Sequence, residues 1–183
     1  MLAQNVGDYS RIKSDDWPLY VQPKLDGVRC LIQYEPEVKH NGDVFCVPEV
    51  VAYSRTGKEW KNIDHILIEL KPFFEKYPDV ILDGELYNHD LKKDFEKIIS
   101  LVRKTKPTDE DRLESAEMVQ FHCYDTIMEH MDFQGRNKFI MNELRDSKSV
   151  RTVPSMLVYN TEEVEAKHED LLELGYEGSI LRQ

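Results

Sequence analysis

The stretch from Gln22 to Arg29 reads QPKLDGVR, and apolar residues lead into it and out of it. This pattern predicts one strand over residues 18–23 and a second over residues 28–35. Lys24 then lies between two strands, followed by a carboxylate and by a glycine that permits a tight reversal. An amine with an ordinary pKa of ~10.4 is protonated at neutral pH, and burial beside a second cation or a metal makes it a nucleophile. The stretch therefore predicts either a reactive lysine or a plain surface hairpin turned by Asp-Gly.

A second landmark is the segment from Val80 to Tyr87, which reads VILDGELY. Strand alternation places Asp83 and Glu85 on one face and the neighbouring apolar residues on the other. Two carboxylates side by side on a mainly apolar strand are costly unless a cation or hydrogen-bond donors meet them. A metal-bound nucleotide would meet them, and exposure at a sheet edge is the alternative.

The composition is that of a globular chain of one large or two small domains. Of its 183 residues, 40% are hydrophobic and 32% are charged, which excludes a disordered chain. The sequence contains no apolar run of the roughly 20 residues that span a bilayer, and no signal-peptide pattern at its start. Its three cysteines include no C-x-x-C pair, which argues for reduced thiols and against a zinc site. We expect an intracellular, cytoplasmic monomer without a membrane partner.

The net charge of −11 argues against tight nucleic-acid binding by this chain alone. The chain has 35 acidic and 24 basic residues, whereas neutralising phosphates requires clustered Lys and Arg. The acidic excess favours a separate basic domain, or a nucleotide ligand that is presented together with a metal.

The rest of the chain alternates predicted strands and helices. Histidine and charged side chains on two of the helices receive no role: Arg136 and Lys138 are expected to be solvated, and His168 to be packed and hydrogen-bonded. Pro72 is expected to kink or end its helix, and Gly175 to end another. A turn is expected over 40–43, and strands over 44–54 (interrupted by Pro48), 118–127 and 150–159 (around Pro154). Helices are expected over 63–77, 91–103 and 132–146, with a short exposed helix within 104–117 that is capped at Pro107-Thr108-Asp109. A last helix is expected after a cap at Asn160, with Val164, His168, Leu171 and Leu172 on its inner face.

Three segments, in chain order, resemble the motifs of one enzyme superfamily. Lys24 to Arg29 resembles the K-x-D-G-x-R signature of covalent nucleotidyltransferases, which comprise DNA ligases, RNA ligases and mRNA capping enzymes. Glu85 lies in a segment similar to their D-G-E-L motif, 61 residues after Lys24 (85 − 24). Residues 176–182, YEGSILR, resemble the E-G-x-x-apolar-K/R motif, in which Glu177 opens the last strand.

Weaker resemblances lie before and between these motifs. Ser54 to Glu59 resembles the ligase S-R-x-G element, although an ordinary surface loop would read the same. Tyr124-Asp125 falls where ligases often have Phe-Asp, whose ring stacks on adenine, and core packing is the alternative. Met1 to Ala3 resembles the run that often precedes the nucleophile in ATP-dependent DNA ligases.

The resemblance implies an α+β fold with two antiparallel sheets flanked by helices and the nucleotide pocket between them, the ATP-grasp-like nucleotidyltransferase domain. It implies that residues 1–183 form an adenylation domain that is incomplete at its C-terminus. The superfamily's K-x-K motif, expected soon after the E-G motif, and its oligonucleotide-binding-fold (OB-fold) domain are both absent from this sequence.

The resemblance also implies the chemistry. Lys24 would attack the α-phosphate of ATP, release pyrophosphate and carry AMP as a lysyl-AMP intermediate. The AMP would pass to the 5′-phosphate of nicked double-stranded DNA, bound through the full-length protein, in replication, repair or recombination. Mg²⁺ would offset the charge on the phosphate. The implied site residues are catalytic Lys24, Asp26 and Arg29; nucleotide-binding Gln22, Pro23, Leu25, Arg55, Glu85, Tyr124 and Glu177; and metal-binding Glu85 and Glu177.

Gln22 matches the position whose side chain reads the adenine edge, where many ligases have Glu. The whole pattern is most similar to a small ATP-dependent DNA ligase. A GTP-using capping enzyme shares the same motifs and stays open as an alternative. A non-catalytic nucleotide-binding or partner-binding remnant is a third reading, favoured by the missing K-x-K motif and the acidic surface.

Overall fold

The structure is a computed structural model of the chain, and it describes residues 12–36, 38–40, 43–45, 49–91 and 95–183. The Met1–Ala3 resemblance, the middle of the expected turn at residues 41–42, and Pro48 lie outside the described residues.

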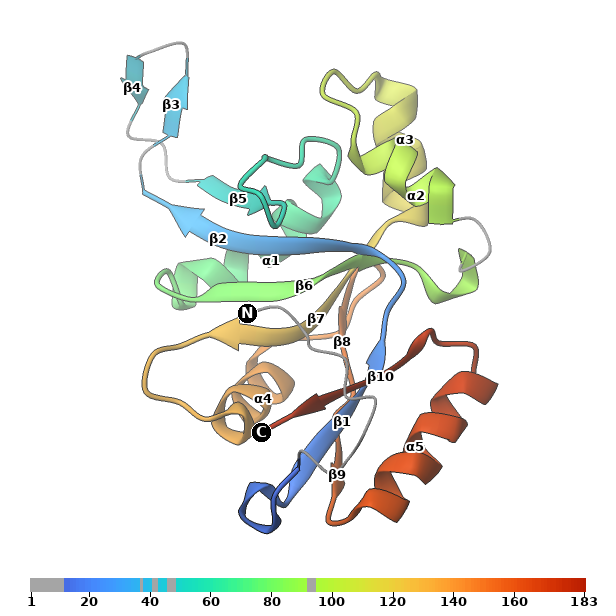
Figure 1. The fold of residues 1–183 in the computed structure, drawn as a ribbon. Coiled ribbons are helices and arrows are strands. Elements are labelled where there is room, and N and C mark those ends of the chain that lie inside the picture. The colour runs from blue at the N-terminus through green and yellow to red at the C-terminus, as the bar shows by residue number, and fades with distance from the viewer. Residues whose placement is uncertain (1–11, 37, 41–42, 46–48, 92–94) are drawn as a thin grey trace.

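Two sheets carry the fold, as Figure 1 shows. The smaller sheet has the strand order β10-β1-β9, and all its neighbours are antiparallel. The larger sheet has the order β5-β2-β6-β7-β8, and it is antiparallel except where β8 joins β7 in parallel. The α+β fold is therefore confirmed, with one parallel pair at an edge. The strands are β1 (Leu19–Lys24), β2 (Val28–Glu35), β3 (Val38–His40), β4 (Asp43–Phe45), β5 (Glu49–Tyr53), β6 (Ile81–Tyr87), β7 (Gln120–Ile127), β8 (Val150–Thr152), β9 (Met156–Val158) and β10 (Gly178–Arg182), with β3 and β4 paired by themselves.

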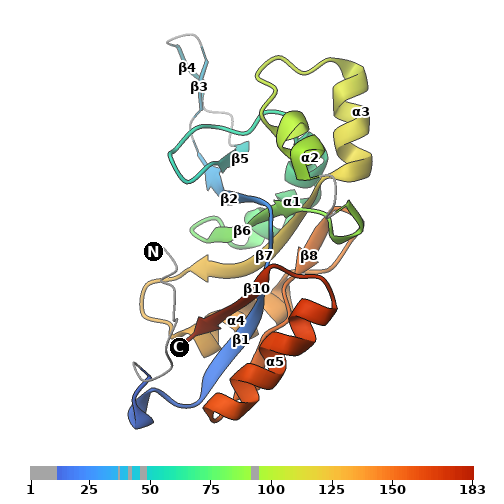
Figure 2. The same ribbon diagram turned by 45° about the vertical axis from the view of Figure 1, so that its right-hand side comes forward.

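Helices cover the two sheets separately. Figures 1 and 2 show α5 alongside the smaller sheet, while α1, α2 and α3 lie with the larger one. The helix that packs on β7 is α4. None of the helices in the described ranges is long and apolar enough to cross a bilayer. The helices are α1 (Asp64–Lys76), α2 (Phe95–Val102), α3 (Asp109–Met118), α4 (Phe133–Glu143) and α5 (Thr161–Glu173), with short 3-10 turns at Ser14–Asp16 and His89–Leu91.

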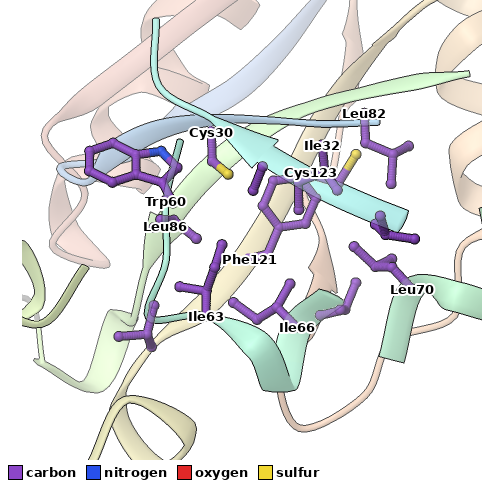
Figure 3. Packing of buried hydrophobic residues seen from close by; sticks show 14 of the residues in the cluster. Cys30, Ile32, Trp60, Ile63, Ile66, Leu70, Leu82, Leu86, Phe121 and Cys123 are labelled. Atoms are coloured by element: carbon purple, nitrogen blue, oxygen red, sulfur yellow. The ribbon is translucent and has the colours of Figure 1, made fainter. Parts of the chain in front are cut away.

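Each sheet has its own hydrophobic core. The larger core lies between the five-stranded sheet and α1, where Ile66 and Leu70 belong to the same buried cluster as Phe121 of β7 (Figure 3). The smaller core joins Val21 of β1 to Leu171 of α5. Burying this apolar surface is the main favourable term in the folding of each half. Cys30 and Cys123 are free, buried thiols in the larger core, as expected for reduced cysteines.

The strands β1 and β2 do not pair with each other, so the hairpin alternative is wrong. β1 lies between β10 and β9, whereas β2 lies between β5 and β6. The apolar residues before and after Lys24 belong to different cores, which separates the two strands. Residues 25–27 are therefore the crossing from one sheet to the other.

The single strand expected over residues 150–159 is also wrong. Its first part is β8 of the larger sheet and its second part is β9 of the smaller sheet. Pro154 lies between them, and a proline cannot donate to a strand ladder. The chain thus crosses between the sheets a second time, close to Ser155.

The sequence predicted the ends of the helices more accurately than it predicted which side chains face the core. Thr108 and Asn160 cap α3 and α5, each accepting a hydrogen bond from the backbone N–H three residues on, at 3.2 and 2.9 Å. Gly175, with φ of +86°, follows the end of α5 as predicted. Leu172 was expected on the inner face of α5, but it is 46% exposed. Pro72 lies inside α1, on its exposed side, and the helix continues to Lys76.

Gly84 is a packing constraint in the middle of β6. A Cβ atom there would lie 2.4 Å from the carbonyl oxygen of His122 and 2.5 Å from Cε2 of Phe121, on the neighbouring strand. We expect Gly84→Ala to lower the free energy of unfolding by about 1–3 kcal/mol, because the β6–β7 contact has to open. Denaturant unfolding of both proteins measures this.

The matched control is Gly178→Ala, since a Cβ at this position meets nothing closer than Cε1 of His168 at 3.4 Å. An equal loss of stability in the two variants would contradict the packing argument.

Candidate active site

Lys24 lies at the end of β1, directly before the crossing to the larger sheet. Antiparallel pairing with β10 sets Lys24 opposite Gly178, so the backbone N–H of Glu177 donates to the carbonyl of Lys24 at 3.3 Å. The Lys24 ammonium forms an ion pair with the Glu177 carboxylate. Both side chains are about half exposed, at 44% and 46%, and open to a ligand from solvent. The first and third motifs are thus brought together from 153 residues apart.

Glu85 lies close to the same region because its side chain packs against the backbone of Gly27. A Cβ on Gly27 would lie 2.5 Å from Cγ of Glu85 and 2.6 Å from the carbonyl oxygen of Leu86. Glycine is therefore required at position 27 for this close contact, and not for a left-handed backbone. The second motif packs directly against the backbone that follows Lys24.

The pKa of Glu85 is raised to about 8 from an ordinary value of 4.5. Burial is the largest cause, and the negative charges of Asp83, Asp26 and Glu177 add to it, while Arg29 opposes them. Carboxyl groups that crowd together in this way favour a cation between them. Oxygen ligands of this kind suit Mg²⁺, which keeps several waters and takes one or two carboxylates besides substrate phosphates.

Within the described residues, no group of three or more His, Cys, Asp and Glu side chains could hold a metal by itself. Glu85 and Glu177 would therefore be partial ligands, completed by phosphate oxygens and water.

Arg29 forms a bidentate ion pair with Asp83. Its Nε donates to Oδ1 at 2.9 Å and its Nη2 to Oδ2 at 2.6 Å, and this carboxylate raises the pKa of Arg29. Asp83 was not assigned to the site, although strand alternation had already placed it beside Glu85. In this arrangement Arg29 partly neutralises the acidic face of β6. A phosphate that bound Arg29 would compete with Asp83 for its guanidinium.

Gln22 and Lys24 share one face of β1, because side chains two apart on a strand point the same way. The Gln22 side chain is 1% exposed, and its Nε2 donates to the backbone carbonyl of Tyr124 at 2.9 Å. The guanidinium of Arg182 lies 5.2 Å from the centre of the Tyr124 ring. Burial and the negative charges of Asp83 and Glu85 raise the pKa of the Tyr124 hydroxyl, which keeps the ring neutral.

Asp125 joins this face from β7, and the sequence pattern had assigned it no role. It is 9% exposed and accepts from Arg136 at 2.8 and 3.1 Å and from Arg182 at 3.5 Å. The expectation that Arg136 is solvated is therefore wrong, because α4 packs on β7 and turns this side chain inward. Lys138, two residues after Arg136 and on another side of α4, is exposed as expected. His168 is packed as expected and hydrogen-bonds to Ser179 at 2.9 Å.

The remaining predicted site residues lie at the margin. Asp26 is exposed in the crossing, and its charge acts on Glu85. Pro23 is buried on the opposite face of β1 from Lys24, and with Leu25 it lines a separate hollow of about 270 Å³. Arg55 is exposed at the turn after β5, where Gly57 has φ of +77°.

Comparison with known proteins adds to this geometry. A family model described as "ATP dependent DNA ligase domain" matches residues 1–183. The chain is 29% identical over 167 residues to DNA ligase of African swine fever virus (isolate Warthog/Namibia/Wart80/1980), and 30% identical to that of strain Badajoz 1971 Vero-adapted. Each match covers 88% of this chain, which spans only 36% of the length of those relatives.

Solved structures are similar in fold. A Lig E DNA ligase structure superposes with a TM-score of 0.66 at 21% identity, covering 99% of this chain and 60% of its own. Chlorella virus DNA ligase–adenylate superposes with a TM-score of 0.61 at 18% identity, covering 100% of this chain and 58% of its own. At these identities the likeness establishes the fold of the chain.

The raised pKa of Glu85 predicts a pH-dependent stability. Between about pH 4.5 and 8 the folded chain holds a proton on Glu85 that the unfolded chain releases, so the free energy of unfolding falls as the pH rises through this range. Glu85→Gln removes this loss. The variant should therefore gain stability relative to wild type as the pH rises, by roughly 1.4 kcal/mol for each pKa unit of separation. Urea unfolding across this range measures the difference.

The control is Glu165→Gln, a change at an exposed position of α5. A constant stability difference between Glu85→Gln and wild type at all pH values would contradict the burial of an acid at this site.

Proposed function

The chain belongs to the ATP-dependent DNA ligase domain family, and from this premise we propose that residues 1–183 are the adenylation domain of an ATP-dependent DNA ligase. The single observation that carries the proposal is the convergence of Lys24, Glu85 and Glu177 where the chain crosses between the sheets. The chain spans 36% of the length of its curated relatives, so nick sealing on double-stranded DNA is proposed for the full-length protein.

Lys24 is the proposed nucleophile. Its amine loses a proton, the nitrogen attacks the α-phosphate of ATP, and the bond to the β-phosphate oxygen breaks to release pyrophosphate. The product is a lysyl-AMP phosphoramidate. The Glu177 carboxylate is paired with this ammonium, and it holds the side chain at the end of β1 in reach of a ligand.

Glu85 and Glu177 are the proposed metal-side carboxylates. A Mg²⁺ ion at this place would offset the charge that develops on the phosphate. The crowding of Asp26, Asp83 and Glu177 around Glu85 supports a cation here, because a cation would offset the burial and the repulsion that together raise the pKa of Glu85.

Transfer of the AMP is the proposed second step. The 5′-phosphate of a nick takes the AMP from Lys24, and the neighbouring 3′-hydroxyl then displaces it to join the strands. Asp26, Arg29 and Arg55 are proposed to orient this chemistry, and Tyr124 to stack on the adenine, with Gln22, Pro23 and Leu25 completing the nucleotide site. Such an intracellular enzyme would serve DNA replication, repair or recombination.

Lys24→Ala tests the nucleophile. With α-labelled ATP and Mg²⁺, wild type should take up covalent label that acid releases and alkali does not, as a phosphorus–nitrogen bond requires. Lys24→Ala should take up none, while the control Lys167→Ala, which removes a partly exposed lysine of α5 paired with Asp170, should label like wild type. Gel autoradiography measures the label.

Three outcomes distinguish the functions. Label from ATP alone supports the ligase, and label from GTP alone supports a capping enzyme. Absence of label from either nucleotide, in this chain and in one extended through the next lysine motif, overturns the catalytic proposal in favour of a nucleotide-binding or partner-binding remnant.

The carboxylates are tested by Glu85→Gln and Glu177→Gln. Each should slow the labelling of Lys24 at saturating ATP by about tenfold or more, equivalent to ~1.4 kcal/mol of barrier, and should raise the Mg²⁺ concentration that gives half-maximal rate. Glu173→Gln, an exposed position near the end of α5, is the control. An unchanged Mg²⁺ requirement in both variants would remove these residues from the metal site.

A further inference from the structure

Gln22 is a buried amide that joins the two sheets through four elements of the fold. Its Nε2 donates to the backbone carbonyl of Tyr124 on β7 and to Oγ of Ser155, both at 2.9 Å. Its Oε1 accepts from Nε of Arg182 on β10 at 3.1 Å. The side chain is 1% exposed, so water does not compete for these positions.

The partners of Gln22 determine which way its amide group points. A backbone carbonyl only accepts and a guanidinium only donates, so Tyr124 and Arg182 agree on the orientation. The hydroxyl of Ser155 can either donate or accept a hydrogen bond. However, Ser155 donates its hydrogen to Oδ1 of Asn137 at 2.9 Å, and only a lone pair is left to face Gln22.

Asn137 and Ser155 come from places that the sequence does not connect. Asn137 lies on α4, whereas Ser155 lies at the crossing between β8 and β9. Both are partly buried. Together they form a relay in which the acceptor on Asn137 orients the Ser155 hydroxyl, and the hydroxyl orients Gln22.

These hydrogen bonds determine which donor or acceptor of Gln22 remains unused and could bind a ligand. Both of its N–H groups are used, whereas Oε1 has two lone pairs and Arg182 takes one of them. The remaining group is an acceptor. The 6-amino group of adenine donates to an acceptor, while the 6-oxo group of guanine also carries lone pairs and repels it.

We propose that Ser155 and Asn137 are positioning residues that hold Gln22 with its acceptor toward the base and thereby give the site its preference for adenine over guanine nucleotides. This assignment rests on the proposed function, in which Gln22 reads the base edge. Without the Ser155 hydroxyl one N–H of Gln22 loses its partner, and only the Tyr124 carbonyl and Arg182 still oppose a turn of the amide about its last bond. A turned amide presents an N–H, which matches the 6-oxo group of guanine and not the 6-amino group of adenine.

The test compares paired variants that remove or keep each hydrogen-bonding atom. Ser155→Ala removes the hydroxyl and Ser155→Thr keeps it; Asn137→Leu removes the acceptor and Asn137→Asp keeps it. Initial rates of Lys24 labelling with α-labelled ATP and GTP, over a range of concentrations, give kcat/KM for each nucleotide. Melting temperatures with and without each nucleotide report binding independently of labelling.

Ser155→Ala and Asn137→Leu should lower the ratio of kcat/KM for ATP to that for GTP by about tenfold, mainly through KM, as expected for a hydrogen bond worth ~1.4 kcal/mol. The stabilisation by ATP relative to GTP should shrink in parallel. Ser155→Thr and Asn137→Asp should keep the wild-type ratios.

A merely structural role would lower the rates and melting temperatures for both nucleotides together and leave the ratio unchanged, and this result would overturn the assignment. If wild type labels Lys24 from ATP and the ratios do not move, the proposed function stands and only this inference fails. Absence of label in wild type would overturn both.

Discussion

The site depends on the contact between Gly27 and Glu85. The chain crosses from the smaller sheet to the larger one over residues 25–27, and the absence of a side chain at Gly27 lets this crossing lie against Cγ of Glu85. Because Lys24 directly precedes the crossing and pairs with the strand that Glu177 leads into, one close contact sets the distance between the three motifs. Any side chain at position 27 would separate the lysine from the carboxylate that is proposed to hold its metal.

The site concentrates like charges. Glu85, Asp83, Asp26 and Glu177 lie near enough to act on one another, and Arg29 compensates for only part of their charge. Such an arrangement costs stability, which is a reason to expect a function for it. The acidic balance of the whole chain fits the proposed nucleotide ligand that arrives with a metal, since a cluster of carboxylates attracts a cation and repels a bare phosphate.

Polar groups hold the two sheets in register behind the lysine. Gln22 and Arg182 of the smaller sheet reach Tyr124 and Asp125 of the larger one, and Arg136 of α4 completes the set. Breaking a buried pair of this kind by removing one partner is costly, because the other charge stays unpaired. The same contacts that fix the distance between the sheets therefore also orient the residues proposed to meet the base.

Local pattern in the sequence correctly predicted the strands on either side of Lys24, the shared face of Asp83 and Glu85, and the caps at Thr108 and Asn160. These features follow from periodicity and from hydrogen bonds between residues close in the chain. The motif residues were found by resemblance. Tertiary structure alone decided that the strands flanking Lys24 belong to different sheets, that Arg136 is turned inward, and that Gln22 is held by Ser155. These outcomes depend on contacts between residues far apart in the chain, such as Gln22 and Ser155 at 133 positions, and no local pattern encodes such contacts.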